Sequence, residues 1–86
     1  MKIEIKNTEG KVIFSHDCED NTIKLTVEEA VRAKVNLTGA NLTWANLAGA
    51  KLTGANFTGA NLIGADLTGA DLTGAYLPWA NGFQKK

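Results

Sequence analysis

Residues 35–79 read VNLTG ANLTW ANLAG AKLTG ANFTG ANLIG ADLTG ADLTG AYLPW, nine quintets that repeat one pattern. The middle residue of each quintet is leucine or, once, phenylalanine, and the residue two places before it is valine once and then always alanine. The residue two places after it is glycine, except at Trp44 and Trp79. A short fixed period forces every unit into the same backbone shape and the same burial, so this stretch decides the fold.

A period of five fits neither the helical period of 3.6 nor the strand period of 2. The two apolar residues of a quintet are two apart and point the same way along an extended piece, while the Asn, Asp and Thr residues point the other way. The glycine permits a bend. Each quintet is therefore predicted to be one side of a coil, whose turns pair at about the 4.8 Å spacing of strands. The predicted core is Leu37, Leu42, Leu47, Leu52, Phe57, Leu62, Leu67, Leu72 and Leu77.

The Ala-(Asn/Asp)-Leu-Thr-Gly units resemble those of the pentapeptide-repeat proteins, and they cover slightly more than half of the chain. The resemblance implies an all-β fold, a right-handed quadrilateral β-helix of four quintets per coil and about two coils here. Residues twenty apart would then stack. We expect residues 1–34 to form an N-terminal cap, residues 35–84 the β-helix and residues 85–86 a tail.

The segment before the repeats is predicted to cap the coil, because a solenoid end exposes its apolar interior and unpaired backbone edges. Residues 2–6 alternate as a strand with Ile3 and Ile5 inward. Residues 7–10 read as a turn and residues 11–15 as the returning strand, which together predict a hairpin.

A polar loop is expected over residues 16–21 and a short extended piece over residues 22–25. Thr26 and Glu29 match a capping box, which predicts a helix that starts at Thr26 and ends near Lys34. The cap is thus predicted to be a β-hairpin plus a short helix.

The composition describes a single domain near the lower size limit for one core, with 86 residues and a net charge of zero. No global field attracts it to nucleic acid or to an anionic membrane, so we expect direct binding to neither. It has no apolar run that could span a membrane and no signal peptide. The one cysteine, Cys18, cannot form an internal disulfide, which favours a cytoplasmic location.

Residues suited to chemistry are few. His16 and Cys18 stand together in the polar loop, but neither has the further partners that a metal site or a nucleophilic pair requires. Asp66 and Asp71 belong to successive sides of the coil, which disfavours an acid/base pair. We therefore predict no catalytic residue, no metal and no cofactor.

Aromatic residues depart from the repeat and are the candidates for an interface. These candidates are Trp44, Tyr76, Pro78, Trp79 and Phe83. Phe83 could fold over the open end of the coil as a plug, or the C-terminal aromatic residues could form an apolar patch for self-association. Both interpretations remain open at this stage.

The function predicted from the resemblance is that of a non-catalytic protein-binding module. Similar short proteins of phages and prophages suggest an inhibitor or protector of a nucleic-acid-handling or defence protein, acting as a DNA mimic or as an anti-CRISPR protein. Family members that bind DNA gyrase present an acidic rod, whereas the only acidic residues of this coil are Asp66 and Asp71. A structural homodimer joined through the C-terminal coil is the alternative. A remote alternative is ice binding through outward threonines, namely Thr38, Thr43, Thr53, Thr58, Thr68 and Thr73.

Overall fold

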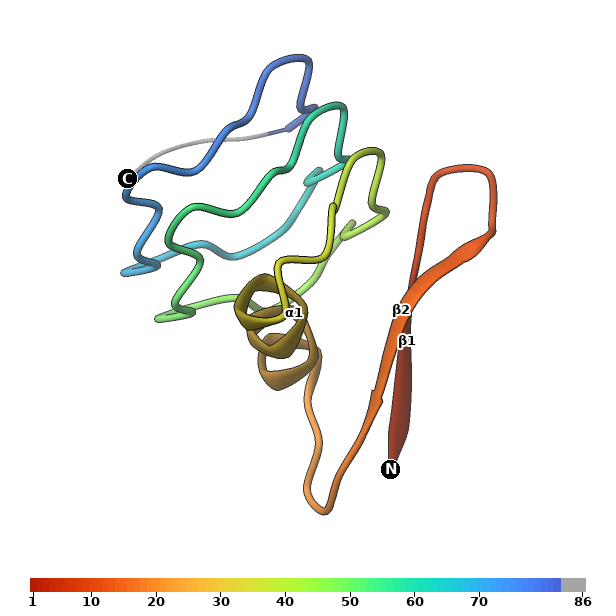
Figure 1. Ribbon diagram of the computed structural model, residues 1–86. Helices are drawn as coiled ribbons and strands as arrows, with labels where there is room; N and C mark the ends of the chain where they lie inside the picture. Colours follow the sequence, from red (N-terminus) through yellow and green to blue (C-terminus); the bar gives the residue numbers. More distant parts are fainter. Residues whose placement is uncertain (83–86) are drawn as a thin grey trace.

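The computed structural model describes residues 1–82. Within that range the regular elements are β1 (Lys2–Lys6), β2 (Val12–Asp17) and α1 (Ile23–Arg32). The chain then runs in tight turns that are joined by isolated bridges. Figure 1 shows these turns stacked above α1, with the β1–β2 hairpin to one side.

The predicted hairpin is present. β1 and β2 pair antiparallel from Lys2↔Asp17 onward, with an irregularity between Ile5 and Lys6. Asn7 fixes the turn, because its side-chain oxygen accepts hydrogen bonds from two backbone N–H groups of the turn, each at 2.9 Å. β2 continues through His16 and Asp17, so the polar loop starts later than expected.

The predicted start of the helix is wrong. α1 begins at Ile23, and its N-cap is Thr22, whose side-chain oxygen accepts from the N–H of Leu25 at 3.1 Å. Thr26 lies in the first turn, fully buried, and its hydroxyl donates to the carbonyl of Thr22 at 2.9 Å. A helix needs only one side-chain cap for its first free N–H groups, and Thr22 supplies it a turn earlier than the capping-box pattern suggested. Residues 22–25 are therefore cap and helix rather than an extended piece.

The helix ends in a Schellman motif without a glycine. The N–H of Lys34 donates to the carbonyl of Val31 at 3.0 Å, and the N–H of Val35 donates to the carbonyl of Ala30 at 2.9 Å. Lys34 has a left-handed φ of 61° at the position where glycine is usual. This end turns the chain directly into the first quintet.

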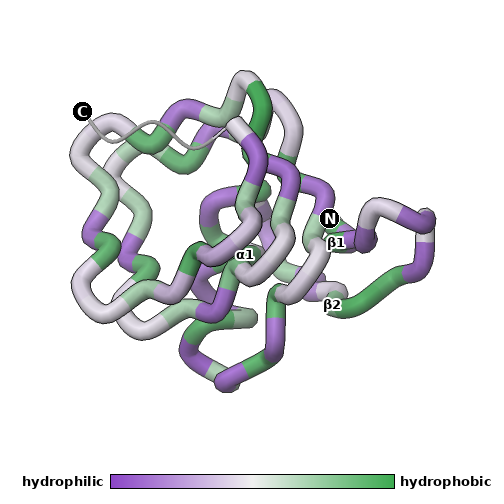
Figure 2. Tube along the Cα trace, turned by 90° about the horizontal axis from the view of Figure 1, so that it is seen from above, coloured by the Kyte–Doolittle hydropathy of each residue, from purple (hydrophilic) through white to green (hydrophobic). Residues whose placement is uncertain are grey.

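The repeats form a coil in which residues twenty apart lie one above the other. The N–H of Leu47 donates to the carbonyl of Asp66 at 2.8 Å, and the N–H of Asp66 donates to the carbonyl of Ala45 at 2.9 Å. Equivalent parallel bridges join Asn41 to Asn61, Asn46 to Asp66, Lys51 to Asp71, Asn56 to Tyr76 and Asn61 to Asn81. Four quintets thus separate stacked residues, and the architecture is of the β-helix type. Figure 2 looks down on the coil and shows its angular outline.

Each quintet bends at its last two positions. The carbonyl of Leu47 accepts from the N–H of Ala50 at 3.0 Å, and Gly49 between them has a φ of +71°. This is the positive φ that a type II turn requires at its third residue. The side chain at the second position of the quintet holds the bend from outside, as the oxygen of Asn41 does by accepting from the N–H and hydroxyl of Thr43.

The lower side of the coil is covered by the N-terminal segment. The N–H of Asn41 donates to the carbonyl of Lys6 at 2.7 Å, and the N–H of Lys51 donates to the carboxylate of Glu28 on α1 at 2.8 Å. Ile5, Val27 and Ala30 of the cap join the coil leucines in one core, listed as Ile5, Val27, Ala30, Leu37, Ala40, Leu42, Ala45, Leu47, Ala50, Leu52, Ala55, Phe57, Ala60 and Leu62. The segment before the repeats therefore meets both needs of a solenoid end, burial and backbone pairing.

Candidate protein-interaction surface

Two tryptophans stand at bends that the other repeats fill with glycine. Trp44 and Trp79 have φ values of 60° and 62°, within the left-handed region. A residue other than glycine costs about 1–2 kcal/mol in that conformation. Their side chains nevertheless remain 78% and 84% exposed. These two bends therefore combine backbone strain with exposed aromatic surface.

The ring of Trp44 lies across Gly64 of the coil above. A Cβ built on Gly64 would fall 2.3 Å from the Trp44 Cε3 atom and 2.6 Å from Cδ2 and Cζ3. The backbone pairs at the same place, since the N–H of Trp44 donates to the carbonyl of Ile63 at 2.9 Å. Only a glycine fits beneath the ring. Trp44 therefore reaches one coil upward and packs on Gly64.

The last quintet brings three of the candidate residues together. Tyr76 and Pro78 accept backbone hydrogen bonds from Phe57 and Gly59 below, at 2.7 and 2.9 Å, and Trp79 follows at the bend. Tyr76 is 61% exposed. In most quintets an Asn or Asp side chain at the second position accepts a hydrogen bond from the N–H at the fourth position. Here Tyr76 has no carboxyl or amide oxygen for this bond, and Pro78 has no N–H to donate it. Trp44 stands at the next bend around the coil, in the first coil, so it is separate from this group. Phe83 lies outside the described residues.

The upper edge of the coil carries backbone groups without partners among residues 1–82. In the coil below, the corresponding N–H groups are paired. The N–H of Gly49, for example, donates to the carbonyl of Thr68 at 2.8 Å. Within residues 1–82 no acceptor in a coil above is present for the N–H groups of Gly69, Leu72, Gly74 and Leu77. Leu67, Leu72 and Leu77 are also only partly buried, whereas Leu47, Leu52 and Phe57 beneath them are fully buried. Within the described residues, this edge therefore combines partly buried leucines with backbone N–H groups that have no partner.

Ile63 is an exposed apolar residue that sequence reasoning did not single out. It is 48% exposed and occupies a position that is threonine in most quintets, which was the available signal. Gly82 packs directly on it, because a Cβ on Gly82 would fall 2.5 Å from the Cα of Ile63. Gly82 also stands where the repeat would place another leucine. The regular pattern therefore stops at Asn81 in the described chain.

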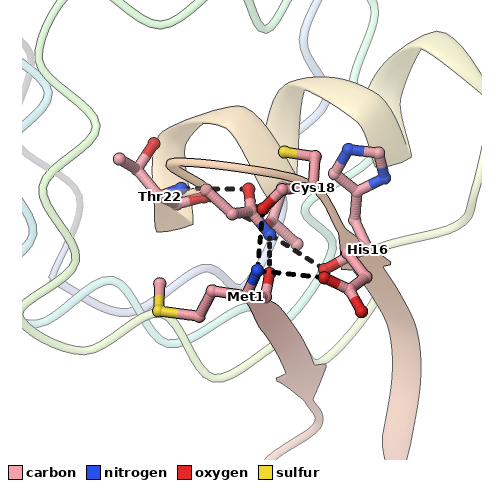
Figure 3. Close-up of polar contacts among 7 residues, drawn as sticks. Met1, His16, Cys18 and Thr22 are labelled. Atoms are coloured by element: carbon pink, nitrogen blue, oxygen red, sulfur yellow. Dashed lines mark hydrogen bonds and ion pairs between the residues drawn. The ribbon is translucent and has the colours of Figure 1, made fainter.

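The His16 and Cys18 region is a structural junction (Figure 3). The amino group of Met1 donates to the Cys18 carbonyl at 2.8 Å and pairs with Asp17 at 3.0 Å. The buried Asn21 amide donates to the carbonyls of Met1 and His16, at 3.1 and 2.8 Å. His16 and Cys18 contribute carbonyl oxygens to these contacts rather than the imidazole or the thiol. The network ties the hairpin ends to the start of α1.

Charges on the coil are sparse. Lys51 and Asp71 stack on one side through a parallel bridge. The Thr73 hydroxyl and backbone N–H donate to the carboxylate of Asp71 at 2.7 and 3.0 Å. These bonds hold the pKa of Asp71 below its usual value, with smaller contributions from Thr53 and the charge of Lys51.

No group of three or more His, Cys, Asp or Glu side chains in the described part of the chain is arranged to hold a metal ion. Nor does any helix among residues 1–82 have the length and apolar character to cross a membrane.

Comparison with known proteins gives one finding. A family model described as pentapeptide repeats matches residues 36–74 in eight copies. No curated protein and no solved structure matches the chain.

Proposed function

Because its repeats place this chain in the pentapeptide-repeat family, we propose that it is a non-catalytic protein-interaction module built on a right-handed, four-sided β-helix. The coil acts as a rigid support, and the residues that depart from the repeat provide the binding surface. The observation that carries the proposal is the pair of exposed tryptophans in left-handed backbone. Glycine at both bends would remove the strain, and because most of each tryptophan side chain stays exposed, a binding role for that surface explains why the strain is kept.

The proposal is tested by capture from a bacterial lysate with immobilised protein. The variant carries Trp44→Gly and Trp79→Gly, which restore the residue of the repeat and relieve the backbone strain. The matched control is Leu25→Ala, which removes an exposed apolar side chain from α1. Circular dichroism establishes that all three proteins are folded. We expect a protein captured by the wild type and the control and absent with the double variant, and equal capture by all three would refute the proposal.

Within this class we propose an inhibitor or protector of a nucleic-acid-handling or defence protein. Small size and an exposed aromatic surface support an inhibitor that docks on a protein. The two acidic coil residues, Asp66 and Asp71, give less support to DNA mimicry, and outward threonines stack at most in pairs. An excess of the protein that leaves DNA gyrase supercoiling unchanged would dispose of the DNA-mimic mechanism.

Self-association through the last coil is the second candidate function. It is favoured by the upper edge, where, among residues 1–82, backbone N–H groups without partners and partly buried leucines lie side by side. Unpaired edges of this kind favour pairing with another chain. Sedimentation velocity across a range of concentrations tests it, and a monomer at every concentration would refute it.

A further inference from the structure

A groove runs between α1 and the fourth quintet of the coil, residues 50–54. Two hollows of about 480 and 430 Å³ lie along it and share Val31 and Thr53, so they form one continuous groove. Each hollow is of the size at which proteins hold ligands, about 300–1,000 Å³. Neither tryptophan lines the groove, which is therefore separate from the surface described above.

The coil wall of this groove carries two backbone acceptors without donors. One coil above, the carbonyl of Thr73 accepts from the N–H of Gly54 at 2.9 Å. The equivalent carbonyl of the first coil is that of Thr53, and no donor within residues 1–82 bonds to it or to the carbonyl of Lys51. On α1, Glu28 accepts from the N–H of Lys51 at 2.8 Å. In extended backbone the N–H and C=O of one residue point to the same edge, so the carbonyl of Lys51 also faces α1.

Basic side chains outnumber acidic ones along the groove. Its charged lining consists of Lys24, Arg32, Lys34, Lys51 and Glu28. Arg32 is paired with Glu29 at 2.9 Å, whereas none of the three lysines forms an ion pair within the described chain. The groove therefore has unpaired positive charge beside its free carbonyls.

The ammonium group of Lys24 lies against the opposite wall of the groove. A Cβ built on Gly49 of the coil would fall 3.7 Å from the Lys24 Nζ atom. Lys51 follows two residues after Gly49 on the same wall, so α1 and the coil each contribute a lysine to this end of the groove. Asp71 stacks one coil above Lys51 and does not line the groove.

We propose that this groove binds an extended acidic segment of a partner protein, which adds as a strand below the first coil. N–H groups of the segment donate to the carbonyls of Lys51 and Thr53, and its carboxylates pair with Lys24 and Lys51. The inference extends the proposed protein-interaction function to a second surface, and it does not depend on the tryptophans.

A protein segment fits both features of the groove, whereas a nucleic acid fits one. Phosphates would pair with the lysines, but a sugar-phosphate backbone has no regular row of N–H donors for the two carbonyls. The net charge of zero also gives no long-range attraction for a polyanion. Alternation of acidic and apolar residues suits the segment, because successive side chains of a strand point to opposite faces and half-buried Val31 and Val35 line the groove beside the lysines.

The test is an NMR titration of the isotope-labelled full chain with a synthetic hexapeptide, Glu-Val repeated three times. The matched peptide has Gln in place of each Glu. We expect the acidic peptide to give saturable shifts of the amide signals of Lys51, Thr53 and Gly54 and to leave the indole signals unchanged. The matched peptide should bind more weakly, and added salt should weaken the acidic peptide.

Matched lysine variants locate the charge effect. Lys24→Gln combined with Lys51→Gln should weaken peptide binding about tenfold, because two ion pairs are lost. The control combines Lys2→Gln with Lys11→Gln, which removes the same net charge from exposed positions of the hairpin and should leave the affinity unchanged.

Three results would overturn the inference: no saturable shift at millimolar peptide, equal binding of the two peptides, or an equal loss of affinity in the two lysine variants. A six-nucleotide oligothymidine that binds the groove as tightly as the acidic peptide would assign it to nucleic acid and overturn the inference as well. The variant with Trp44→Gly and Trp79→Gly should bind the peptide like the wild type. Failure of the tryptophan surface in the capture experiment is therefore distinguishable from failure of the groove.

Discussion

Replacement of Gly64 by alanine tests the contact between the Trp44 ring and the coil above it. Gly64 has a φ of +74° and lies under the ring of Trp44. Gly69 has nearly the same φ and has nothing within 4 Å of an added Cβ. The two substitutions therefore share the backbone cost, and only Gly64→Ala also collides with a ring.

The expected difference follows from the contact area. The shared left-handed strain is about 1–2 kcal/mol for each alanine. Trp44 is 78% exposed, so about a fifth of its surface is covered. For an aromatic side chain that is about 50 Å², worth about 1 kcal/mol at 25 cal/mol per Å². A methyl group on residue 64 would lie 2.3 Å from Cε3 of Trp44, so the ring must move away from residue 64 and the stabilisation from this buried area is lost.

We therefore expect Gly64→Ala to destabilise the protein by about 1 kcal/mol more than Gly69→Ala, measured by urea denaturation at low protein concentration. In a domain of this size that corresponds to about 4–8 °C in Tm. In the Trp44→Gly background the two alanine substitutions should cost the same, because the ring is gone. A difference that persists in that background would show that the ring is not the cause and would refute the reasoning.

Three further predictions concern the core, the cap and the charges. Phe57→Ala should cost about 3–5 kcal/mol, because Phe57 is 1% exposed in mid-coil; calorimetry that finds a cost below 1 kcal/mol would contradict its burial. Glu28→Ala should cost about 1 kcal/mol in urea denaturation, because it leaves the N–H of Lys51 without its 2.8 Å acceptor. The control substitution Glu19→Ala, at an exposed loop position, should leave the free energy of unfolding unchanged. The pKa of Asp71 is lower in the folded protein than in the unfolded chain. The Asp71 carboxylate therefore adds to the free energy of unfolding above the ordinary Asp pKa, and this addition is lost as pH falls through the pKa of Asp71 in the folded state. Asp71→Asn should therefore flatten the acid limb of stability against pH, and an unchanged limb would rule this contribution out.

Most of the coil could be predicted because its sequence is redundant. Every quintet repeats the same inward pair, so an error at one position is corrected by its neighbours, and the buried Leu, Phe and Ala residues between Leu37 and Leu62 follow directly. The number of sides in each coil could not be predicted in this way. Nothing in a five-residue period distinguishes four sides from three or five, and the resemblance to a known family supplied that number.

The cap was harder to predict because each of its signals occurs once. The capping-box pattern predicted Thr26 as the helix cap, whereas in the structure Thr26 is buried and bonded to Asn21 and Thr22, and Thr22 is the cap. The helix end was predicted near Lys34 and lies at Arg32, although Lys34 adopts a left-handed φ where a glycine would have marked the position more sharply. The packing of Trp44 on Gly64 could not be predicted from the sequence either, because it depends on the stacking of two residues that are twenty positions apart.

A periodic sequence specifies the inside of a solenoid but cannot specify where the solenoid stops. Each quintet presents the same donors and acceptors upward and downward, so a pure repeat would stack without limit. Ends must therefore be made by residues that break the pattern. At the lower end β1 and the carboxylate of Glu28 occupy the backbone groups of the first coil. In the last quintet Tyr76, Pro78 and Trp79 break the pattern, because they replace the Asn or Asp, the Thr and the glycine of most other quintets while Tyr76 and Pro78 keep their backbone pairing with the coil below.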